Sequence, residues 1–284
     1  MREILSCPVC GLPLAVRDKC YACSAGHSYD IAKQGYVNLL LGKGGSVHGD
    51  NALMITARRR FLSKGYYTPL VSRLTHMLQK YATEKPVLLD IGCGEGYYTE
   101  PASRAIAPFG GTAYAFDISK DALKAASQRR CATLFAASAY KIPVLDETVD
   151  IATLFFSPLS REEIFRVLRP GGLFITAYPG ERHLWGLKRA IYDTPYLNRP
   201  EDTSLDGFNL IEKTDISKEI LLPDNETLTD LFAMTPYYYK TGERDKAKLA
   251  SLSSLTTEIA FHLCVYKKNY NTEQKQCQES EKKP

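Results

Sequence analysis

The chain has 284 residues, of which 44% are hydrophobic and 24% are charged, and its formal net charge is +4. This length corresponds to roughly two domains, and this composition is that of a globular protein with a core of its own. No run of about 18 apolar residues occurs, which excludes a transmembrane helix, and no apolar signal core precedes the first cysteines, so we expect a cytoplasmic protein.

The first 40 residues predict a small zinc-binding module. Cys7 and Cys10 form one close pair, and Cys23 and His27 form a second. Two close pairs of such ligands suit tetrahedral zinc, and in an intracellular chain they favour a metal over disulfides. Cys20 complicates the ligand count, because it forms a second CxxC with Cys23. The spacing leaves open whether His27 or Cys20 is the fourth ligand.

Residues 41–81 predict a linker followed by two basic helices. The Gly-rich stretch at residues 42–46 is typical of a flexible linker. From Asp50 to about Tyr81, apolar residues recur at intervals of three and four, and Gly65 and Pro69 divide this stretch into two helices. Residues 1–80 carry 11 Lys and Arg against 4 Asp and Glu. Such a basic first third indicates contact with a polyanion.

From residue 82 to residue 268 the chain alternates strands and helices, which predicts a parallel, doubly wound sheet with helices on both faces. A late strand is expected at residues 258–266, and the polar tail at 269–284 is expected to be disordered. The main strands are expected at residues 87–91, 111–116, 131–136, 149–156 and 173–178, with helices from about residue 97 and at 121–130 and 162–168.

A glycine-rich turn follows the first of these strands. Asp90 precedes Gly92, Gly94 and Gly96, and Asp117 ends the next strand. This spacing departs from the GxGxxG that holds a pyrophosphate, and it suits a ligand with a cationic centre and no phosphate. A carboxylate at Asp117 can accept hydrogen bonds from ribose hydroxyls. The combination resembles the Rossmann-like S-adenosylmethionine-dependent methyltransferases, an α/β fold class.

Two further positions bear on that resemblance. Ser138, before the fourth strand, would lie near the adenine of the cofactor. After the fourth strand stands Phe155-Phe156-Ser157-Pro158-Leu159. The Asn/Asp-Pro-Pro-Tyr of enzymes that methylate exocyclic amines of bases is absent there, which disfavours that chemistry.

Several segments together resemble the RlmA-type 23S rRNA guanine-N1 methyltransferases, from Cys7 to at least Tyr192. Besides the cysteine pairs and the glycine turn, the segments that carry the resemblance are residues 30–40, 57–62, 65–70 and 179–184. The resemblance implies methylation of N1 of a guanine in hairpin 35 of 23S rRNA, at position 745 or 748. One branch of the family is linked to resistance to tylosin-type macrolides. The resemblance also implies zinc at Cys7, Cys10, Cys23 and His27, and cofactor contacts at Tyr67, Gly94, Glu95 and His183.

The complete set of expected cofactor contacts is Tyr67, Asp90, Gly92, Gly94, Glu95, Gly96, Asp117, Ser138 and His183. Guanine N1 is on the pairing edge of the base, so the base must leave the helix before it can be methylated. We expect His183 to be catalytic, either at the methionine end of the cofactor or in removal of the N1 proton. Tyr67 is expected to cap the pocket, although a core tyrosine would give the same pattern.

The expected RNA contacts are Arg58, Arg59, Arg60 and Lys64, for which a solvated helix face is the alternative. The expected partner is 23S rRNA, with no membrane, and a homodimer stays open. An alternative function is S-adenosylmethionine-dependent methylation of another RNA or of a small molecule. A non-catalytic RNA-binding protein would predict a damaged glycine turn, whereas this turn is intact.

Overall fold

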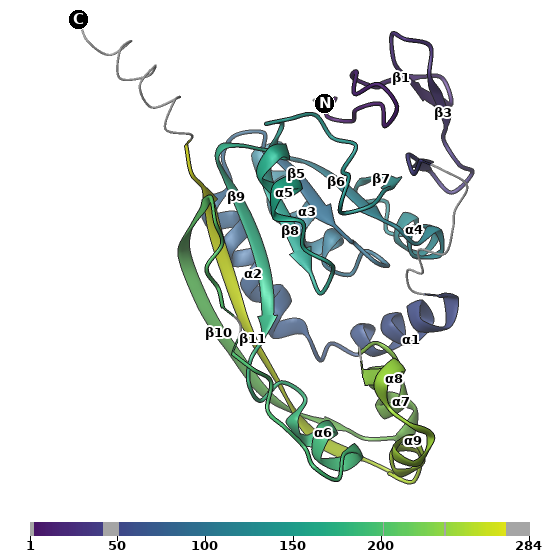
Figure 1. The fold of residues 1–284 in the computed structure, drawn as a ribbon, viewed down its shortest axis with the longest axis vertical. Helices are drawn as coiled ribbons and strands as arrows, with labels where there is room; N and C mark the ends of the chain where they lie inside the picture. The colour runs from purple at the N-terminus through teal and green to yellow at the C-terminus, as the bar shows by residue number, and fades with distance from the viewer. Residues whose placement is uncertain (1–2, 42–50, 201, 236, 271–284) are drawn as a thin grey trace, which may run out of the picture.

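A computed structural model describes residues 3–41, 51–200, 202–235 and 237–270 (Figure 1). The predicted linker at residues 42–46 and residues 271–284 of the predicted tail lie outside these residues. The centre of the fold is an eight-stranded mixed sheet. In order across the sheet, its strands are β10 (Phe208–Leu222), β11 (Leu255–Lys268), β9 (Leu168–Pro179), β8 (Val149–Phe155), β5 (Val87–Ile91), β6 (Thr112–Asp117), β7 (Thr133–Ala136) and β4 (Tyr36–Asn38).

Helices and loops cover both faces of this sheet, as the alternation of strands and helices predicts. In β5 every residue is buried: Leu88 belongs to the core under α2 and α3, whereas Leu89 and Ile91 belong to the core on the opposite face. The predicted Rossmann-like organisation is therefore confirmed. The helices are α1 (Ala52–Ser63), α2 (Thr68–Tyr81), α3 (Thr99–Ile106), the 3-10 turn η1 (Ala107–Phe109), α4 (Lys120–Ser127), α5 (Arg161–Val167), α6 (Trp185–Ile191), α7 (Asn225–Ala233), α8 (Tyr237–Lys240) and α9 (Glu243–Ala250).

The hairpin of β10 and β11 extends well beyond the rest of the sheet. The two strands pair antiparallel along their whole length, from Phe208 opposite Lys268 to Leu222 opposite Leu255. At the far end of the hairpin lie α6, α7, α8 and α9, which we call the cap (Figure 1). The late strand is confirmed as β11, whereas β10 and the cap helices were not predicted. Strand β9 begins at residue 168, earlier than the expected residue 173.

The first 41 residues are joined to the large sheet. Strands β1 (Ala15–Arg17), β2 (Cys20–Ala22) and β3 (Ser28–Asp30) form a small antiparallel sheet, and β4 pairs in parallel with β7 at the edge of the large one. The Ser6 N–H donates to the Pro143 carbonyl at 3.0 Å, and the Leu145 N–H donates to the Ile4 carbonyl at 2.8 Å. The predicted border at residue 40 stays a prediction, and a strand of the large sheet lies just before it.

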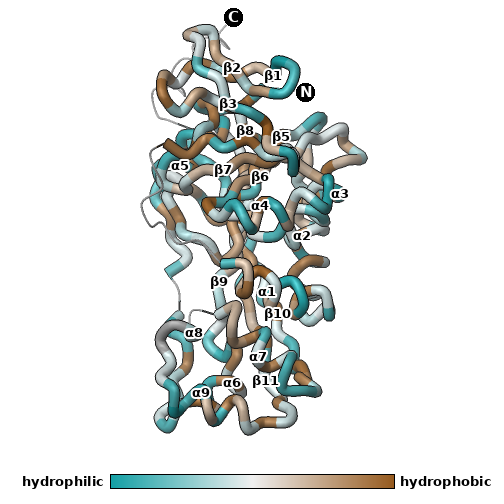
Figure 2. The backbone as a smooth tube through the Cα atoms, turned by 90° about the vertical axis from the view of Figure 1, so that its right-hand side faces the viewer, coloured by the Kyte–Doolittle hydropathy of each residue, from teal (hydrophilic) through white to brown (hydrophobic). Residues whose placement is uncertain are grey.

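The zinc module, the sheet and the cap follow one another along the long axis of the molecule (Figure 2). Helices α1 and α2 meet near Gly65 and Pro69, as predicted: α1 ends at residue 63 and α2 starts at residue 68, with the proline in its first turn. Within the described parts of the chain, no helix is both long and apolar enough to span a bilayer.

Candidate functional site

A cavity of about 720 Å³ opens where β5, β6 and β8 end, between the sheet and the cap. Its wall combines the loop after β5, the ends of the neighbouring strands, and residues of α1 and of the cap region. Ligands of open α/β sheets bind in this place, outside the carboxyl ends of parallel strands. The expected cofactor residues that line the cavity are Tyr67, Gly92, Gly94, Glu95, Asp117, Ser138 and His183.

The loop after β5 requires glycine. Gly92, Gly94 and Gly96 have φ of +67°, +56° and +84°, which favour a residue without Cβ. A Cβ on Gly92 would lie 2.0 Å from Ser157 Oγ. The Asp117 carboxylate accepts hydrogen bonds from the Gly94 N–H and from the backbone N–H of residue 119, both at 2.8 Å. Asp117, the second acid of the motif, therefore stabilises the glycine turn that follows Asp90, the first acid.

Asp90 and Gly96 lie behind the cavity wall. Asp90 is buried and accepts hydrogen bonds from the hydroxyls of Thr99 and Thr153, and burial raises its pKa to about 6. This carboxyl joins β5, β8 and α3. Gly96 lies under the side chain of Arg129, whose Cδ is 2.9 Å from where a Cβ would be. Asp90 and Gly96 therefore help to set the conformation of the glycine loop.

Glu95 presents a buried carboxylate at the cavity. Its Oε2 pairs with Arg129 Nη2 at 2.6 Å, and Arg129 Nε donates to the Glu95 carbonyl at 2.8 Å. Burial raises the pKa of Glu95, although Arg129 opposes this shift. Within the described residues, Glu95 Oε1 is buried without a hydrogen-bond partner. An unpaired buried acceptor is costly, so a ligand that brings a donor would be stabilised here.

His183 lines the cavity as a ring with one nitrogen already engaged. Its Nδ1 accepts a hydrogen bond from the Ala260 N–H at 3.2 Å, so the neutral ring carries its proton on Nε2. Burial, together with the nearby Lys188 ammonium, lowers the pKa of His183 to about 3. A ring that stays neutral and is already protonated on Nε2 cannot take up the guanine proton. Of the two roles expected for His183, the structure favours the contact with the cofactor.

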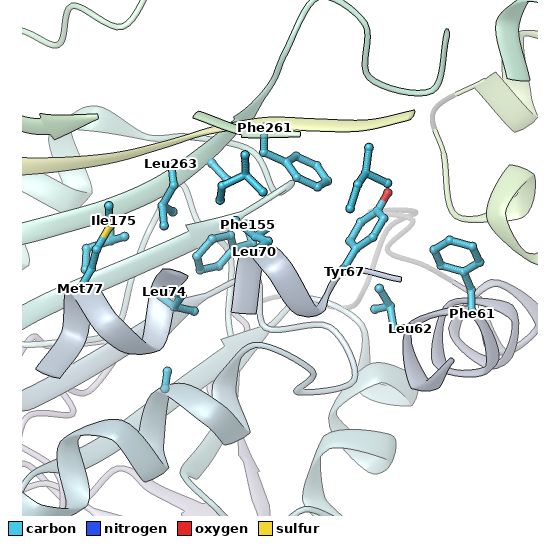
Figure 3. Close-up of a cluster of buried hydrophobic side chains, with 14 of the residues drawn as sticks. Phe61, Leu62, Tyr67, Leu70, Leu74, Met77, Phe155, Ile175, Phe261 and Leu263 are labelled. Atoms are coloured by element: carbon cyan, nitrogen blue, oxygen red, sulfur yellow. The ribbon is translucent and has the colours of Figure 1, made fainter. Parts of the chain in front are cut away.

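Tyr67 is both a core residue and a cavity residue. It is buried, and its ring lies edge-on to those of Phe61 and Phe261, with centroids 5.6 and 5.1 Å away (Figure 3). The His183 ring is 6.3 Å away. Tyr67 therefore joins α1, β11 and the cavity wall, which accommodates both interpretations of this residue.

Arg60 and Lys64 connect α1 to the cap. Arg60 donates to both carboxylate oxygens of Asp230, at 2.9 and 2.5 Å, and pairs with Glu226 at 3.0 Å. The Lys64 ammonium donates to the Thr227 hydroxyl. Because the Asp230 side chain is only 1% exposed, Arg60 compensates a buried charge. Half of the expected RNA contacts thus have intramolecular partners on α7.

The other two expected RNA contacts point to different places. Arg58 lines the cavity beside the glycine loop, and Arg59 is exposed and donates to the Gln128 side chain at 2.7 Å. The four basic residues at α1 and its C-cap therefore do not form one surface. Contact with RNA stays a prediction for each of them.

The four zinc ligands that the resemblance implies come together. The ligand atoms of Cys7, Cys10, Cys23 and His27 lie within 4.8 Å of one another. The sulfurs of Cys10 and Cys23 are 3.7 Å apart, and Cys23 Sγ is 3.4 Å from His27 Nδ1. A tetrahedral zinc with bonds of about 2.3 Å separates its sulfur ligands by about 3.8 Å, so an ion fits. Cys20 Sγ instead donates to a backbone carbonyl of its own hairpin.

Part of the cavity wall lies outside the expected cofactor contacts. These residues follow β8, end β9 or belong to the cap region, and they include Phe156, Pro179, Asn198, Thr235 and Tyr237. The segment after β8 was considered only for a motif that it lacks. Its position beside the glycine turn, at the end of the adjacent strand, was the signal that could have identified it.

Comparison with known proteins covers both parts of the chain. Residues 5–41 match a family described as RlmA, N-terminal, and residues 89–176 match a methyltransferase domain. A protein of Micromonospora griseorubida that is named as a 23S rRNA (guanine-N1)-methyltransferase is 33% identical over 93% of this chain and 97% of its own length.

Two further relatives have similar names. The 23S rRNA (guanine(748)-N1)-methyltransferase of Streptomyces fradiae is 33% identical over 92% of this chain and 96% of its own length. YxjB of Bacillus subtilis, also named as a 23S rRNA (guanine-N1)-methyltransferase, is 29% identical over 68% of this chain and 71% of its own length. The similarity to the first two relatives spans the zinc module, the sheet and the cap.

Proposed function

Because the chain belongs to the RlmA-type family of 23S rRNA guanine-N1 methyltransferases, we propose that its cavity holds S-adenosylmethionine beside the glycine loop and a guanine of 23S rRNA on the cap side. The observation that carries this assignment is the shared wall. Gly94 and Asp117 line the same cavity as Asn198 and Tyr237 of the cap region. Donor and acceptor can therefore meet in one enclosed space.

The polar groups around the loop fit the cofactor. Asp117 suits the ribose hydroxyls, and Ser138 lies on the cavity wall where the adenine is expected. The unpaired Glu95 Oε1 suits the ammonium of the methionine end, and the Nε2–H of His183 suits its carboxylate. When bound, S-adenosylmethionine supplies a methyl group on a sulfonium that needs no further activation. The task of these residues is to bind, orient and exclude water.

The N1 proton of the guanine is assigned to water. The carboxylates that line the cavity are Glu95 and Asp117, and both are engaged on the loop side by Arg129 and by backbone N–H groups. The neutral His183 ring already carries its proton on Nε2, because its Nδ1 accepts from the Ala260 N–H. Glu95 and His183 would hold the methionine end of the cofactor, which would supply the methyl group to N1 and leave as S-adenosylhomocysteine, while the N1 proton would pass to solvent.

Zinc is assigned to Cys7, Cys10, Cys23 and His27, where it stabilises a module too small to have a core of its own. We assign to this module the first contact with rRNA. We place the activity of the protein in the cytoplasm. Guanine 748, which the name of the Streptomyces fradiae relative gives, is the first nucleotide to test in hairpin 35. We also propose that the protein forms a homodimer and that it contributes to resistance against tylosin-type macrolides.

The test is transfer of labelled methyl from S-adenosylmethionine to unmodified 23S rRNA, followed by nucleoside analysis. We expect label in 1-methylguanosine, which can then be located by primer extension. Label in another nucleoside would refute the assignment of guanine N1. Transfer that needs no RNA, or that survives removal of the basic N-terminal third, would favour the alternative of a small-molecule acceptor.

A further inference from the structure

Phe156 has an unusual backbone and an unusual exposure. It directly follows β8 and has φ of +57°, a left-handed conformation that is a genuine outlier for a bulky side chain. The residue is 51% exposed, although its neighbour Phe155 is buried. The exposed ring lines the cavity. A large apolar side chain held in this way costs stability twice, through backbone strain and through exposure to water.

The surroundings hold Phe156 in this conformation. Its ring lies 6.2 Å from that of Tyr98 and 5.6 Å from that of Phe261, so neighbours on two elements fix its position. The next residue, Ser157, touches the glycine loop, because its Oγ occupies the space of a Cβ on Gly92. The segment therefore cannot relax without moving the loop. Strain that is imposed by the surrounding structure is typical of functional sites.

Phe156 lines the cavity together with the glycine loop and with Asn198 and Tyr237 of the cap region. Through Ser157 it adjoins the glycine loop, where the cofactor is placed by the proposed function. Through Phe261 it adjoins His183, whose ring centroid is 4.5 Å from that of Phe261. Because Phe156 is half exposed and lines the cavity, its apolar side chain is accessible to a ligand there.

We propose that Phe156 is the platform on which the extruded guanine stacks during methyl transfer, an inference that rests on the proposed function. Every base has an apolar π face, and stacking on an aromatic side chain is a general way of holding an unpaired base. Phe156 offers no hydrogen bond, so it would fix the plane of the base and leave N1 free on the edge. It would thereby orient N1 towards the methyl carbon without taking part in the bond changes.

Two substitutions separate stacking from packing. Phe156→Gly and Phe156→Ala both remove the ring, but only glycine also removes the strain, since it adopts positive φ readily. We expect both variants to lose roughly 10- to 100-fold in kcat/KM for 23S rRNA, the range that one base stack provides. Phe156→Trp should stay within about threefold of the wild type. Affinity for S-adenosylhomocysteine, measured by calorimetry, should change little in all three.

The stability readout provides the control. We expect Phe156→Gly to unfold at or above the temperature of Phe156→Ala, while both are equally impaired in transfer. Leu159→Ala removes another exposed apolar side chain of the same loop that does not line the cavity, and it should leave kcat/KM unchanged. Wild-type turnover in Phe156→Gly, or a loss that tracks the unfolding temperature, would refute the stacking role. If the wild type itself forms no 1-methylguanosine, the proposed function fails first.

Discussion

Arg129→Met tests whether the ion pair behind the glycine loop holds the cofactor site together. Arg129 bridges Glu95 and Glu100, and its guanidinium also donates to the backbone of the loop. The Glu95 side chain is 1% exposed. Methionine keeps the length of the side chain but removes the charge, so the substitution leaves a buried carboxylate without its cation.

The cost follows from what Glu95 can do in response. Breaking a buried pair costs about 3–5 kcal/mol, unless the remaining group changes its protonation state. Glu95 can escape by taking up a proton. From its ordinary pKa of 4.5, protonation at pH 7 costs about 3.4 kcal/mol, and at pH 5.5 about 1.4 kcal/mol. We therefore expect a loss of about 3 kcal/mol at pH 7, which lowers the unfolding temperature by about 6–12 °C.

The sign of the pH dependence is the sharper part of this prediction. In the variant, the pKa of Glu95 in the folded state lies above its unfolded value, so the folded state binds more protons between these two values. The stability of the variant should therefore rise, relative to the wild type, as the pH falls from 7 to 5.5. Thermal unfolding followed by circular dichroism at both pH values measures this difference.

Two further variants complete the test. Adding Glu95→Gln to Arg129→Met removes the buried charge and should recover most of the lost stability at pH 7. Arg104→Met breaks an exposed pair to the same Glu100 and should change the unfolding temperature by less than about 2 °C. A deficit in Arg129→Met that is as large at pH 5.5 as at pH 7 would show that lost packing, and not the unpaired carboxylate, is responsible.

Three more predictions concern the other parts of the site. Arg60→Met should lower the unfolding temperature and leave the salt dependence of RNA binding unchanged; a flatter salt dependence with normal stability would instead identify a phosphate contact. His183→Ala should weaken S-adenosylhomocysteine binding by roughly 10-fold in calorimetry without altering the shape of the pH–rate profile; loss of a basic limb would contradict the donor role. His27→Ala should abolish zinc binding measured by mass spectrometry of the intact protein, whereas Cys20→Ser should retain the metal; the reverse result would make Cys20 the fourth ligand in place of His27.

The parts of the site that could be predicted are local in sequence. The turn from Asp90 to Gly96 and the acid at Asp117 lie within one strand–helix–strand unit, where each residue type is required by the turn or by the ligand. The strands of the sheet centre were visible as short apolar runs. Pairs of zinc ligands are equally local, because each knuckle provides two donors a few residues apart.

The rest depends on partners far along the chain. A run of three arginines looks the same whether it faces phosphate or carboxylate, and the partner of Arg60 on α7 is 170 residues away. Strand β10 is mostly polar, with exposed residues on both faces over much of its length, so its pattern does not reveal a strand. The cap lies at the far end of the hairpin that this strand forms, and its helices were likewise not predicted. Phe156 was visible only as an ordinary apolar residue, since positive φ leaves no trace in a phenylalanine.

Strand β4 has a consequence for the integrity of the sheet. At the β4 side of the sheet, β7 is the last strand contributed by the methyltransferase domain, and residues 36–38 cover its free N–H and C=O groups. An uncovered edge is a template for pairing with another chain. The N-terminal segment therefore replaces β7 as the edge strand by the three-residue β4, and a short edge strand pairs less readily with another chain. A shortened chain that begins at the glycine-loop domain would lose its metal site and would also expose β7 as an edge strand that can pair with another chain. Insolubility of such a fragment would therefore say nothing about its capacity for methyl transfer.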